Sequence, residues 1–134
     1  MSKSERKRVL SIAPFVCYDL RFPELFRSVA ATHRPDLFVV IASWPEKRLT
    51  HWLRLLQARA IENQAYVVGV NRVGADPFYQ YPGRSVIVDF NGEFLADAGD
   101  KEGCIQAAID LEVLRKYRQG LPFLDDMKPA GANG

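Results

Sequence analysis

The sequence predicts an α/β fold in which helices cover a mixed β-sheet. Apolar runs of strand length at residues 37–43 and 66–70 alternate with segments of helical periodicity at 23–34 and 49–63. Strands that alternate with helices are typical of sheets whose strands are joined by crossover helices. An Asn91-Gly92 pair between two further β-like runs adds a hairpin, so we expect antiparallel pairing in the same sheet.

The first β-like run, residues 9–16, contains Pro14. Since proline has no N–H to donate, we expect this strand to lie at an edge of the sheet or to begin after Pro14. Pro23 then opens a helix, because proline suits the first helical position, and Glu24 in the first turn is favoured by the helix dipole. This helix should end before Pro35.

The centre of the chain has the pattern of a strand, a helix and a second strand. Residues 37–43 form a continuous apolar run, which is typical of a strand covered on both faces. Leucines recur at helical spacing within residues 49–56 and predict a helix that ends near Asn63. Residues 66–70 form another run of the buried type.

The next segments predict a loop followed by a hairpin. Residues 76–83, rich in proline and tyrosine, are expected to form a loop. Residues 85–90 and 93–98 are predicted to pair around a turn in which Asn91 and Gly92 both have positive φ.

The C-terminal part predicts one more strand and one more helix. Residues 105–109 have a β-like pattern, and Cys104 at their start is expected to be packed. Asp110 is expected to cap a helix that ends near Gly120. We therefore expect Cys17 to be the more exposed of the two thiols in the chain.

We expect one domain over residues 11–129, between a basic arm at 1–10 and a disordered tail at 130–134. The arm carries four basic residues and one acidic residue, which leaves 14 basic and 15 acidic residues in the rest of this 134-residue chain. Such an arm could touch nucleic acid, but no stacking-aromatic or recognition-helix pattern follows it. We therefore expect a solvated, disordered arm and no nucleic-acid partner.

Several classes of protein and site are not expected. Two cysteines without a signal-peptide pattern favour reduced thiols and a cytoplasmic location, and no apolar run is long enough to predict a membrane span. His33 and His51 have no zinc-like spacing to each other or to a cysteine, so we expect no metal. No phosphate-binding glycine loop or dinucleotide fingerprint is present, so we expect no cofactor.

Residues 15–27 have the pattern of a strand, a tight charged turn and a helix start. Such an elbow can lift one side chain from a sheet edge and leave backbone N–H groups free beside it, as attack on a carbonyl requires. Cys17 is the candidate nucleophile. The alternative is that Cys17 is a small buried hydrophobic residue.

The segment C-Y-D-L-R-F-P-E at residues 17–24 resembles the nucleophile segment of the nitrilase superfamily of carbon–nitrogen hydrolases, particularly its ω-amidase-like members. The similarity continues through W-P at Trp44, A-R-A-I-E-N-Q-A-Y at 58–66 and N-R-V-G at 71–74. It covers nearly everything between residues 12 and 129.

The resemblance implies a four-layer α-β-β-α sandwich in which two sheets pack face to face. The family's catalytic set is Glu, Lys and Cys, and its Glu and Lys lie well upstream of the cysteine, where this chain has only sixteen residues. We therefore expect this chain to form the C-terminal half of the domain. Half a sandwich would leave an apolar sheet face uncovered, so we expect a homodimer or an N-terminal-half partner.

The resemblance also implies an amidase acting on a small amide substrate. Cys17 would attack the amide carbon, ammonia would leave, and water would hydrolyse the thioester. The backbone N–H of Tyr18 would help to hold the oxyanion, with the upstream lysine as second donor. The competing interpretation is a non-catalytic interaction or scaffold fragment in which Cys17 is chemically idle.

Three charged residues near Cys17 could support it. Arg21 could favour the thiolate, although a surface or packing role is nearly as well supported. Asp19 is expected to bond its own backbone and Glu24 to stabilise a helix N-terminus, so neither is expected to be the general base. Either could still orient the loop around the thiol.

Other candidates lie farther along the chain. Trp44 follows a strand and could line a substrate pocket at its carboxyl end, or pack in the core. Asn71 and Arg72 are candidates for the same pocket, with a loop anchor as the alternative. Arg59 and Glu62 are spaced to form a structural ion pair within a helix.

Overall fold

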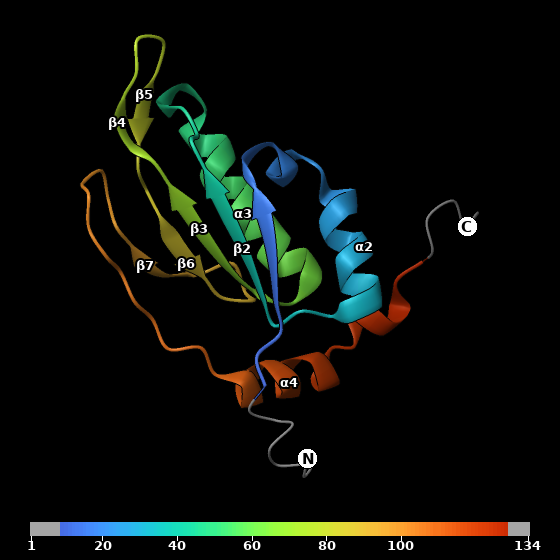
Figure 1. Cartoon of the computed structure of the whole chain (residues 1–134). Helices are drawn as coiled ribbons and strands as arrows, with labels where there is room; N and C mark the ends of the chain where they lie inside the picture. Colours follow the sequence, from blue (N-terminus) through green and yellow to red (C-terminus); the bar gives the residue numbers. More distant parts are fainter. Residues whose placement is uncertain (1–8, 129–134) are drawn as a thin grey trace.

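The computed structural model describes residues 9–128, which form a mixed sheet with helices on both of its faces (Figure 1). Most of the expected basic arm and all of the expected tail at 130–134 therefore lie outside the described residues. None of the helices within this range has the length and apolar character that crossing a membrane requires. The strands are β1 (Ile12–Val16), β2 (Leu37–Ala42), β3 (Tyr66–Asn71), β4 (Val73–Ala75), β5 (Gln80–Pro82), β6 (Val86–Val88) and β7 (Phe94–Asp97), and the helices are α2 (Pro23–His33), α3 (Leu49–Asn63) and α4 (Leu111–Gly120).

The main sheet has five strands in the order β1-β2-β3-β6-β7. β1, β2 and β3 are parallel, with Val39 opposite both Pro14 and Val68, whereas β6 and β7 are antiparallel to their neighbours. Pro14 thus lies on an edge strand, as its missing N–H predicts. The α/β class and the mixed sheet are confirmed. So are the start of α2 at Pro23 and the end of α3 at Asn63.

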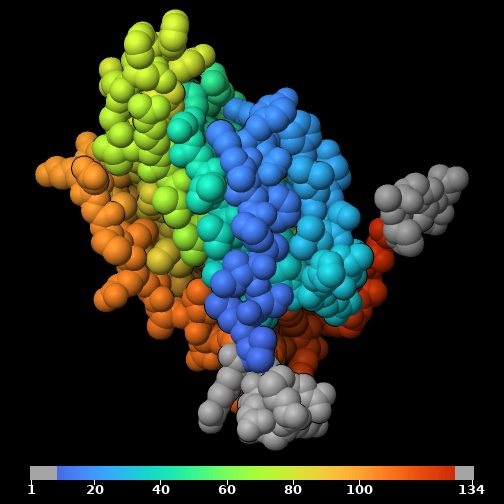
Figure 2. Space-filling model, viewed as in Figure 1, coloured from blue at the N-terminus to red at the C-terminus, as the bar shows by residue number. Residues whose placement is uncertain are grey.

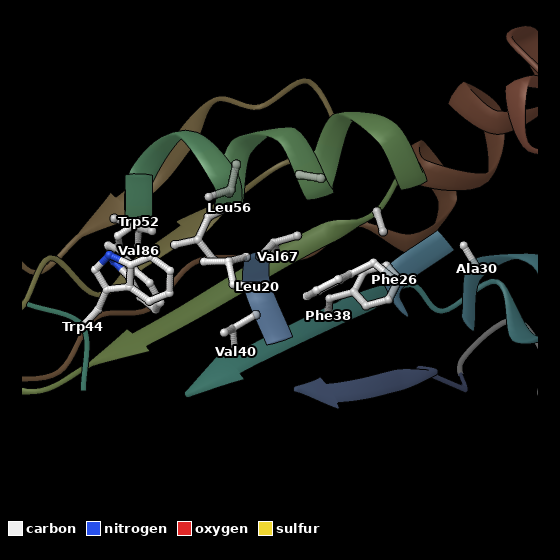
Figure 3. Close-up of a cluster of buried hydrophobic side chains, with 13 residues drawn as sticks. Leu20, Phe26, Ala30, Phe38, Val40, Trp44, Trp52, Leu56, Val67 and Val86 are labelled. Carbon is white, nitrogen blue, oxygen red and sulfur yellow. The ribbon is translucent and has the colours of Figure 1, made fainter. Parts of the chain in front are cut away.

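One face of the sheet is covered by α2 and α3, and the main core lies between these helices and the sheet (Figure 3). Phe38, Val40 and Val67 point from β2 and β3 into this layer and are fully buried. They meet Phe26 of α2 and Leu56 of α3, which are also fully buried. Packing of this kind, rather than intrinsic propensity, supplies most of the stability of short helices.

The other face is covered only at the amino-terminal ends of its strands. There α4 packs Leu114 and Tyr117 against Leu37, Tyr66 and Phe90. No helix lies in front of the carboxyl-terminal ends of β1 and β2 in the view of Figures 1 and 2.

Apolar side chains are exposed where that cover ends. Ile41 and Val70 are 51% and 46% exposed, and Val16 is 57% exposed. The expectation that residues 37–43 are covered on both faces is therefore wrong at the carboxyl end of β2. We define Val16, Ile41 and Val70 as the open face.

The expected hairpin is present between β6 and β7, but its turn differs from the prediction. Gly92 has a φ of 82°, whereas Asn91 is not at positive φ. The N–H of Gly92 donates to the carbonyl of Asp89, and the N–H of Asp89 donates to the carbonyl of Glu93. The connection is thus a longer turn closed by one left-handed glycine rather than a two-residue turn.

Another correction concerns residues 76–83. This expected loop contains β5, which pairs with β4 in a small hairpin that projects beyond the carboxyl ends of the main strands (Figure 1). The sequence pattern missed it because each of its strands has only three residues.

The prediction of a strand at residues 105–109 is also corrected, because residues 103–110 form no strand. Ile105 and Ile109 are partly buried while their neighbours are exposed, so the alternation is real, but no strand of residues 9–128 pairs with this backbone. Cys104 is exposed rather than packed, and Cys17 is the less exposed thiol. The cap on α4 is confirmed, because Asp110 Oδ1 accepts the N–H of Val113 at 3.1 Å.

Candidate active site

Cys17 lies where β1 ends and the 3-10 turn η1 (Cys17–Arg21) begins. Its φ of 43° places a non-glycine residue in the left-handed region, which costs about 1–2 kcal/mol. The expected strand, turn and helix start are all present, and α2 follows at Pro23. Arg34, Gln64 and Arg84 also have positive φ, and Arg34 and Gln64 have it as the C-caps of α2 and α3. Cys17 caps no helix, so its strain fits the concentration of such strain at functional sites.

The two carboxylates near Cys17 have structural contacts. Asp19 Oδ2 accepts the N–H of Val16 at 3.0 Å, so Asp19 bonds the backbone of its own turn as expected. Glu24 is exposed in the first turn of α2, where a negative charge complements the helix dipole. Neither side chain lines the hollow beside Cys17.

A hollow of about 200 Å³ opens beside Cys17 at the carboxyl ends of the parallel strands. This is the edge at which α/β sheets commonly bind ligands. Three segments supply its wall, namely the Cys17 turn, the segment after β2 and the β4–β5 hairpin. The lining residues are Cys17, Tyr18, Arg21, Ser43, Trp44, Pro45, Arg48, Tyr79 and Tyr81.

Arg21 supplies a fixed cation in the wall of the hollow. Its guanidinium lies 4.8 Å from the centroid of the Trp44 ring, within the range of a cation–π contact. Arg21 Nη2 also donates to Nδ1 of His51 at 3.2 Å. The two contacts hold the guanidinium in the same hollow as Cys17.

Trp44 belongs both to the wall of the hollow and to the core. Its side chain is only 3% exposed and its ring lies 5.6 Å from that of Trp52. The indole Nε1–H donates to the carbonyl of Arg48 at 2.7 Å. The two interpretations of Trp44, pocket wall and core packing, are therefore compatible.

Asn71 and Arg72 do not line the hollow. The side chain of Asn71 is buried, accepts the N–H of Trp44 at 2.7 Å and donates to the carbonyl of Gly83 at 2.8 Å. The guanidinium of Arg72 lies 4.4 Å from the ring centroid of Tyr81. These contacts favour the loop-anchor alternative for both residues, because they tie together the segments that form the wall.

The residues that the sequence analysis missed are Ser43, Pro45, Arg48, Tyr79 and Tyr81. The richness of residues 76–83 in tyrosine could have pointed to Tyr79 and Tyr81. The position of this segment, however, depends on hydrogen bonds to Asp76. The carboxylate of Asp76 accepts hydrogen bonds from Tyr81 Oη and from the N–H groups of Phe78 and Tyr79. The hydrogen bond from Tyr81, followed by those backbone donors, lowers the pKa of Asp76, and the same bond raises the pKa of Tyr81.

The expected ion pair between Arg59 and Glu62 is present at 3.2 Å. Arg59 is only 3% exposed, and this burial lowers its pKa, while the charge of Glu62 partly opposes the shift. Its second contact, with the carbonyl of Leu20 in η1, was not predicted.

The lining of the hollow sets limits on its chemistry. It combines one thiol with two guanidinium groups and several aromatic rings, and none of the residues that line it is a carboxylate or a lysine. Within residues 9–128, no three His, Cys, Asp or Glu side chains are grouped so that they could hold a metal ion. The hollow therefore offers a thiol and positive charge, but no carboxylate or lysine that could act as a general base among its lining residues.

Comparison with known proteins finds relatives along most of the chain. The chain is 47% identical over 117 residues to the omega-amidase YafV of Yersinia enterocolitica, covering 86% of this chain and 44% of the relative. It is 42% identical over 113 residues to the 2-oxoglutaramate amidase of Bacillus subtilis, covering 84% of this chain and 43% of that protein. The chain thus spans less than half the length of these relatives.

Solved structures agree on the fold. XC1258 from Xanthomonas campestris, a CN-hydrolase superfamily protein crystallised with an arsenic adduct in its active site, is 37% identical and superimposes with a TM-score of 0.83. The match covers 91% of this chain and 48% of that structure, so this chain corresponds to about half of that solved chain. A family model described as carbon–nitrogen hydrolase matches residues 3–119. This chain belongs to the carbon–nitrogen hydrolase family.

Proposed function

We propose that this chain carries the nucleophile of a thiol amidase that cleaves a small amide. The observation that carries the proposal is Cys17 itself, held at a φ of 43° at the end of β1 and facing a hollow. The thiol attacks the amide carbon, and its proton passes through a base to the leaving nitrogen, which departs as ammonia. Water then cleaves the thioester, which releases the carboxylic acid and regenerates the thiol.

The proposed reaction also needs two oxyanion donors and a base. The backbone N–H of Tyr18 is proposed as one oxyanion donor, and the family resemblance implies a lysine as the second and a glutamate as the base. No lining residue of the hollow is a glutamate or a lysine. General acid–base help is worth about 10²–10⁴-fold in rate, and one oxyanion donor about 10²–10³-fold, so a chain lacking both should react near background.

The charge of the hollow favours a substrate that carries a carboxylate beside its amide. Arg21 is held over Trp44, and the exposed Arg48 side chain has no partner among residues 9–128. Guanidinium groups suit carboxylate recognition because they present paired donors in a fixed plane. The names of two relatives, an omega-amidase and a 2-oxoglutaramate amidase, support an ω-amide of this class.

The open face supports a partner for this chain. Its apolar side chains, at about half exposure, form a surface that a second copy or an N-terminal half of the same domain would cover. The two free cysteines support a cytoplasmic location. Sedimentation at micromolar concentration tests the assembly, and a stable compact monomer would contradict it.

The second candidate function is a non-catalytic interaction fragment of the same fold. The observation that favours it is the missing carboxylate and lysine in the lining of the hollow. In that case the chain would bind a partner through the open face, and Cys17 would remain idle.

Ammonia release tests the two candidates. The full chain would be assayed with glutaramate, which carries a carboxylate, and with neutral butyramide, alone and with an added N-terminal half from a relative. We expect background rates from the chain alone and turnover from the mixture. Cys17→Ala should abolish that turnover and Cys104→Ala should leave it unchanged, while Arg48→Gln should raise KM for glutaramate more than for butyramide.

Two outcomes would contradict the proposal. If the mixture shows no turnover that depends on Cys17, the non-catalytic alternative is favoured. If the unsupplemented chain turns over amides and Cys17→Ala abolishes that activity, a residue of this chain acts as the base and the incomplete site is wrong.

A further inference from the structure

Arg59 is a buried cation that reaches the turn carrying Cys17. It lies in the last part of α3, is 3% exposed, and donates from Nη2 to the carbonyl of Leu20 at 2.7 Å. Leu20 belongs to η1, three positions after Cys17, and lies 39 positions before Arg59 in the sequence. The contact therefore joins α3 directly to the nucleophile turn.

The ion pair with Glu62 does not explain why Arg59 is buried. Glu62 is 34% exposed and lies one turn farther along the same helix, so the pair could form at the surface without burial of either charge. Burial of a guanidinium is unfavourable unless its donors are satisfied, and Nε of Arg59 has no partner among the described residues. The hydrogen bond to the Leu20 carbonyl is itself buried, so Arg59 makes this contact from inside the core.

The same guanidinium touches the element on the other side of the turn. It lies 5.5 Å from the ring centroid of Phe26, which is fully buried in α2. Arg59 thus contacts both η1 and α2, while β1 fixes the chain just before Cys17. Since the N–H of Phe22 already bonds the carbonyl of Asp19, the chain between Cys17 and α2 is held at successive points.

We propose that Arg59 is a positioning residue that holds the Cys17 turn in its left-handed conformation. The catalytic meaning of this inference rests on the proposed nucleophilic role of Cys17. A non-glycine residue at a φ of 43° persists only where surrounding contacts hold it, because relaxation to negative φ would otherwise be favourable. The Leu20 carbonyl is the point at which Arg59 opposes that relaxation.

A mutant cycle measures this coupling without any enzyme assay. Glycine tolerates positive φ, so the melting temperature of Cys17→Gly minus that of Cys17→Ala reports the strain at this position. We expect this difference to be about 3–6 °C larger in the chain that keeps Arg59 than in the chain that carries Arg59→Met. In Arg59→Met the turn is free to relax, so glycine at position 17 gains less over alanine. If Arg59→Met does not fold, Arg59→Lys replaces it, because an ammonium cannot present the planar fork that serves Leu20 and Glu62 together.

Arg118 provides the matched control. It is also largely buried and donates to the backbone carbonyls of Gln64 at 2.8 Å and Pro35 at 2.7 Å, at the amino-terminal end of the strands. Arg118→Met should lower the melting temperature but leave the difference between Cys17→Gly and Cys17→Ala unchanged. The proposal would be overturned if the difference between Cys17→Gly and Cys17→Ala is as large in Arg59→Met as with Arg59 present. It would also be overturned if Arg118→Met reduces this difference as much as Arg59→Met does.

The cycle separates this inference from the proposed function. It depends only on folding, so a chain that proves inactive in the ammonia assay still gives a result. If the cycle shows coupling but the ammonia assay shows no turnover, Arg59 holds the turn and the proposed amidase function is wrong. If turnover is found without coupling, the proposed function stands and the role of Arg59 is wrong.

Discussion

The two faces of the central sheet have similar side chains but different surroundings. On β3, Val67 points toward α2 and α3 and is fully buried, whereas Val70 points to the open face and is 46% exposed. On β2, Val40 and Ile41 differ in the same way. Apolar character alone therefore does not identify the core of this chain, and the position of the helices decides which apolar residues are covered.

Helix α4 shows what cover of the second face achieves. Where it packs, Leu37 and Tyr66 are 6% and 4% exposed, although they belong to the same face as Ile41 and Val70. The open face is thus the continuation of a buried surface beyond the end of α4. Such a surface is more typical of an interface than of a monomer's exterior.

The largest predicted contrast compares one substitution on both faces of β3. Val67→Ala should lower the free energy of unfolding by about 2–3 kcal/mol, because it removes buried methyl groups and leaves a cavity. In the monomeric chain, whose open face is uncovered, Val70→Ala should cost about 0.5–1 kcal/mol, since roughly half of that side chain is exposed there. Urea unfolding of the two variants gives both values.

This contrast would disappear if another chain covers the open face in solution. Val70 would be buried by association if Val67→Ala and Val70→Ala lower the free energy of unfolding equally and the Val70→Ala value depends on protein concentration. Equal losses without that dependence would contradict the assignment of the two faces.

A somewhat smaller effect is expected from Gly69, between the two valines. A Cβ at this position would lie 2.5 Å from Leu56 Cδ1 and 2.8 Å from Trp52 Cζ2, so glycine allows α3 to approach the sheet. Gly69→Ala should cost about 1–3 kcal/mol through overpacking. Gly103→Ala is the control, because no atom lies within 4 Å of its Cβ position, and a loss there equal to that at Gly69 would exclude overpacking.

Much of the fold follows from local sequence signals. Pro23 and Asp110 mark the starts of α2 and α4, and helical periodicity predicts α3 to within a residue of its end. The β-like pattern at residues 105–109 was misleading because side-chain alternation reports one covered side, not the presence of a neighbouring strand. The turn at Asn91 was wrong because its geometry depends on the bulged register of β6 and β7.

The candidate site was also predictable only in part from local sequence signals. Cys17 and Trp44 follow parallel strands, whose carboxyl ends share one edge of the sheet, so their proximity could be expected. Arg48 and Tyr79 were missed because their positions depend on the path of connecting segments. For Tyr79 that path is set by hydrogen bonds to Asp76, which no local periodicity reveals.

The smallest predicted effect is an acid-dependent loss of stability at the ion pair of Arg84 with Asp97. Arg84 donates from Nε and Nη2 to the carboxylate of Asp97, at 3.0 and 2.7 Å, and its carbonyl accepts the indole N–H of Trp52 at 2.8 Å. The hydrogen bonds from Arg84 hold the pKa of Asp97 below its ordinary value. The ion pair therefore links β7 to the helix-covered side of the sheet.

A carboxyl group whose pKa is lowered in the folded state stabilises the fold fully above its unfolded pKa of about 3.9, and this contribution is lost as pH falls through the lower folded value. We expect the pair to contribute about 0.2–1 kcal/mol at neutral pH, because both side chains are about one-third exposed. Asp97→Asn should thus lower the melting temperature slightly at pH 7, and the difference from the unsubstituted chain should shrink below about pH 4. Asp100→Asn is the control at pH 7, where it should leave the melting temperature unchanged, because the Asp100 carboxylate has no partner among residues 9–128. A difference for Asp97→Asn that stays constant down to pH 2 would show that the amide disturbs packing, and that the ion pair does not link the two sides of the sheet.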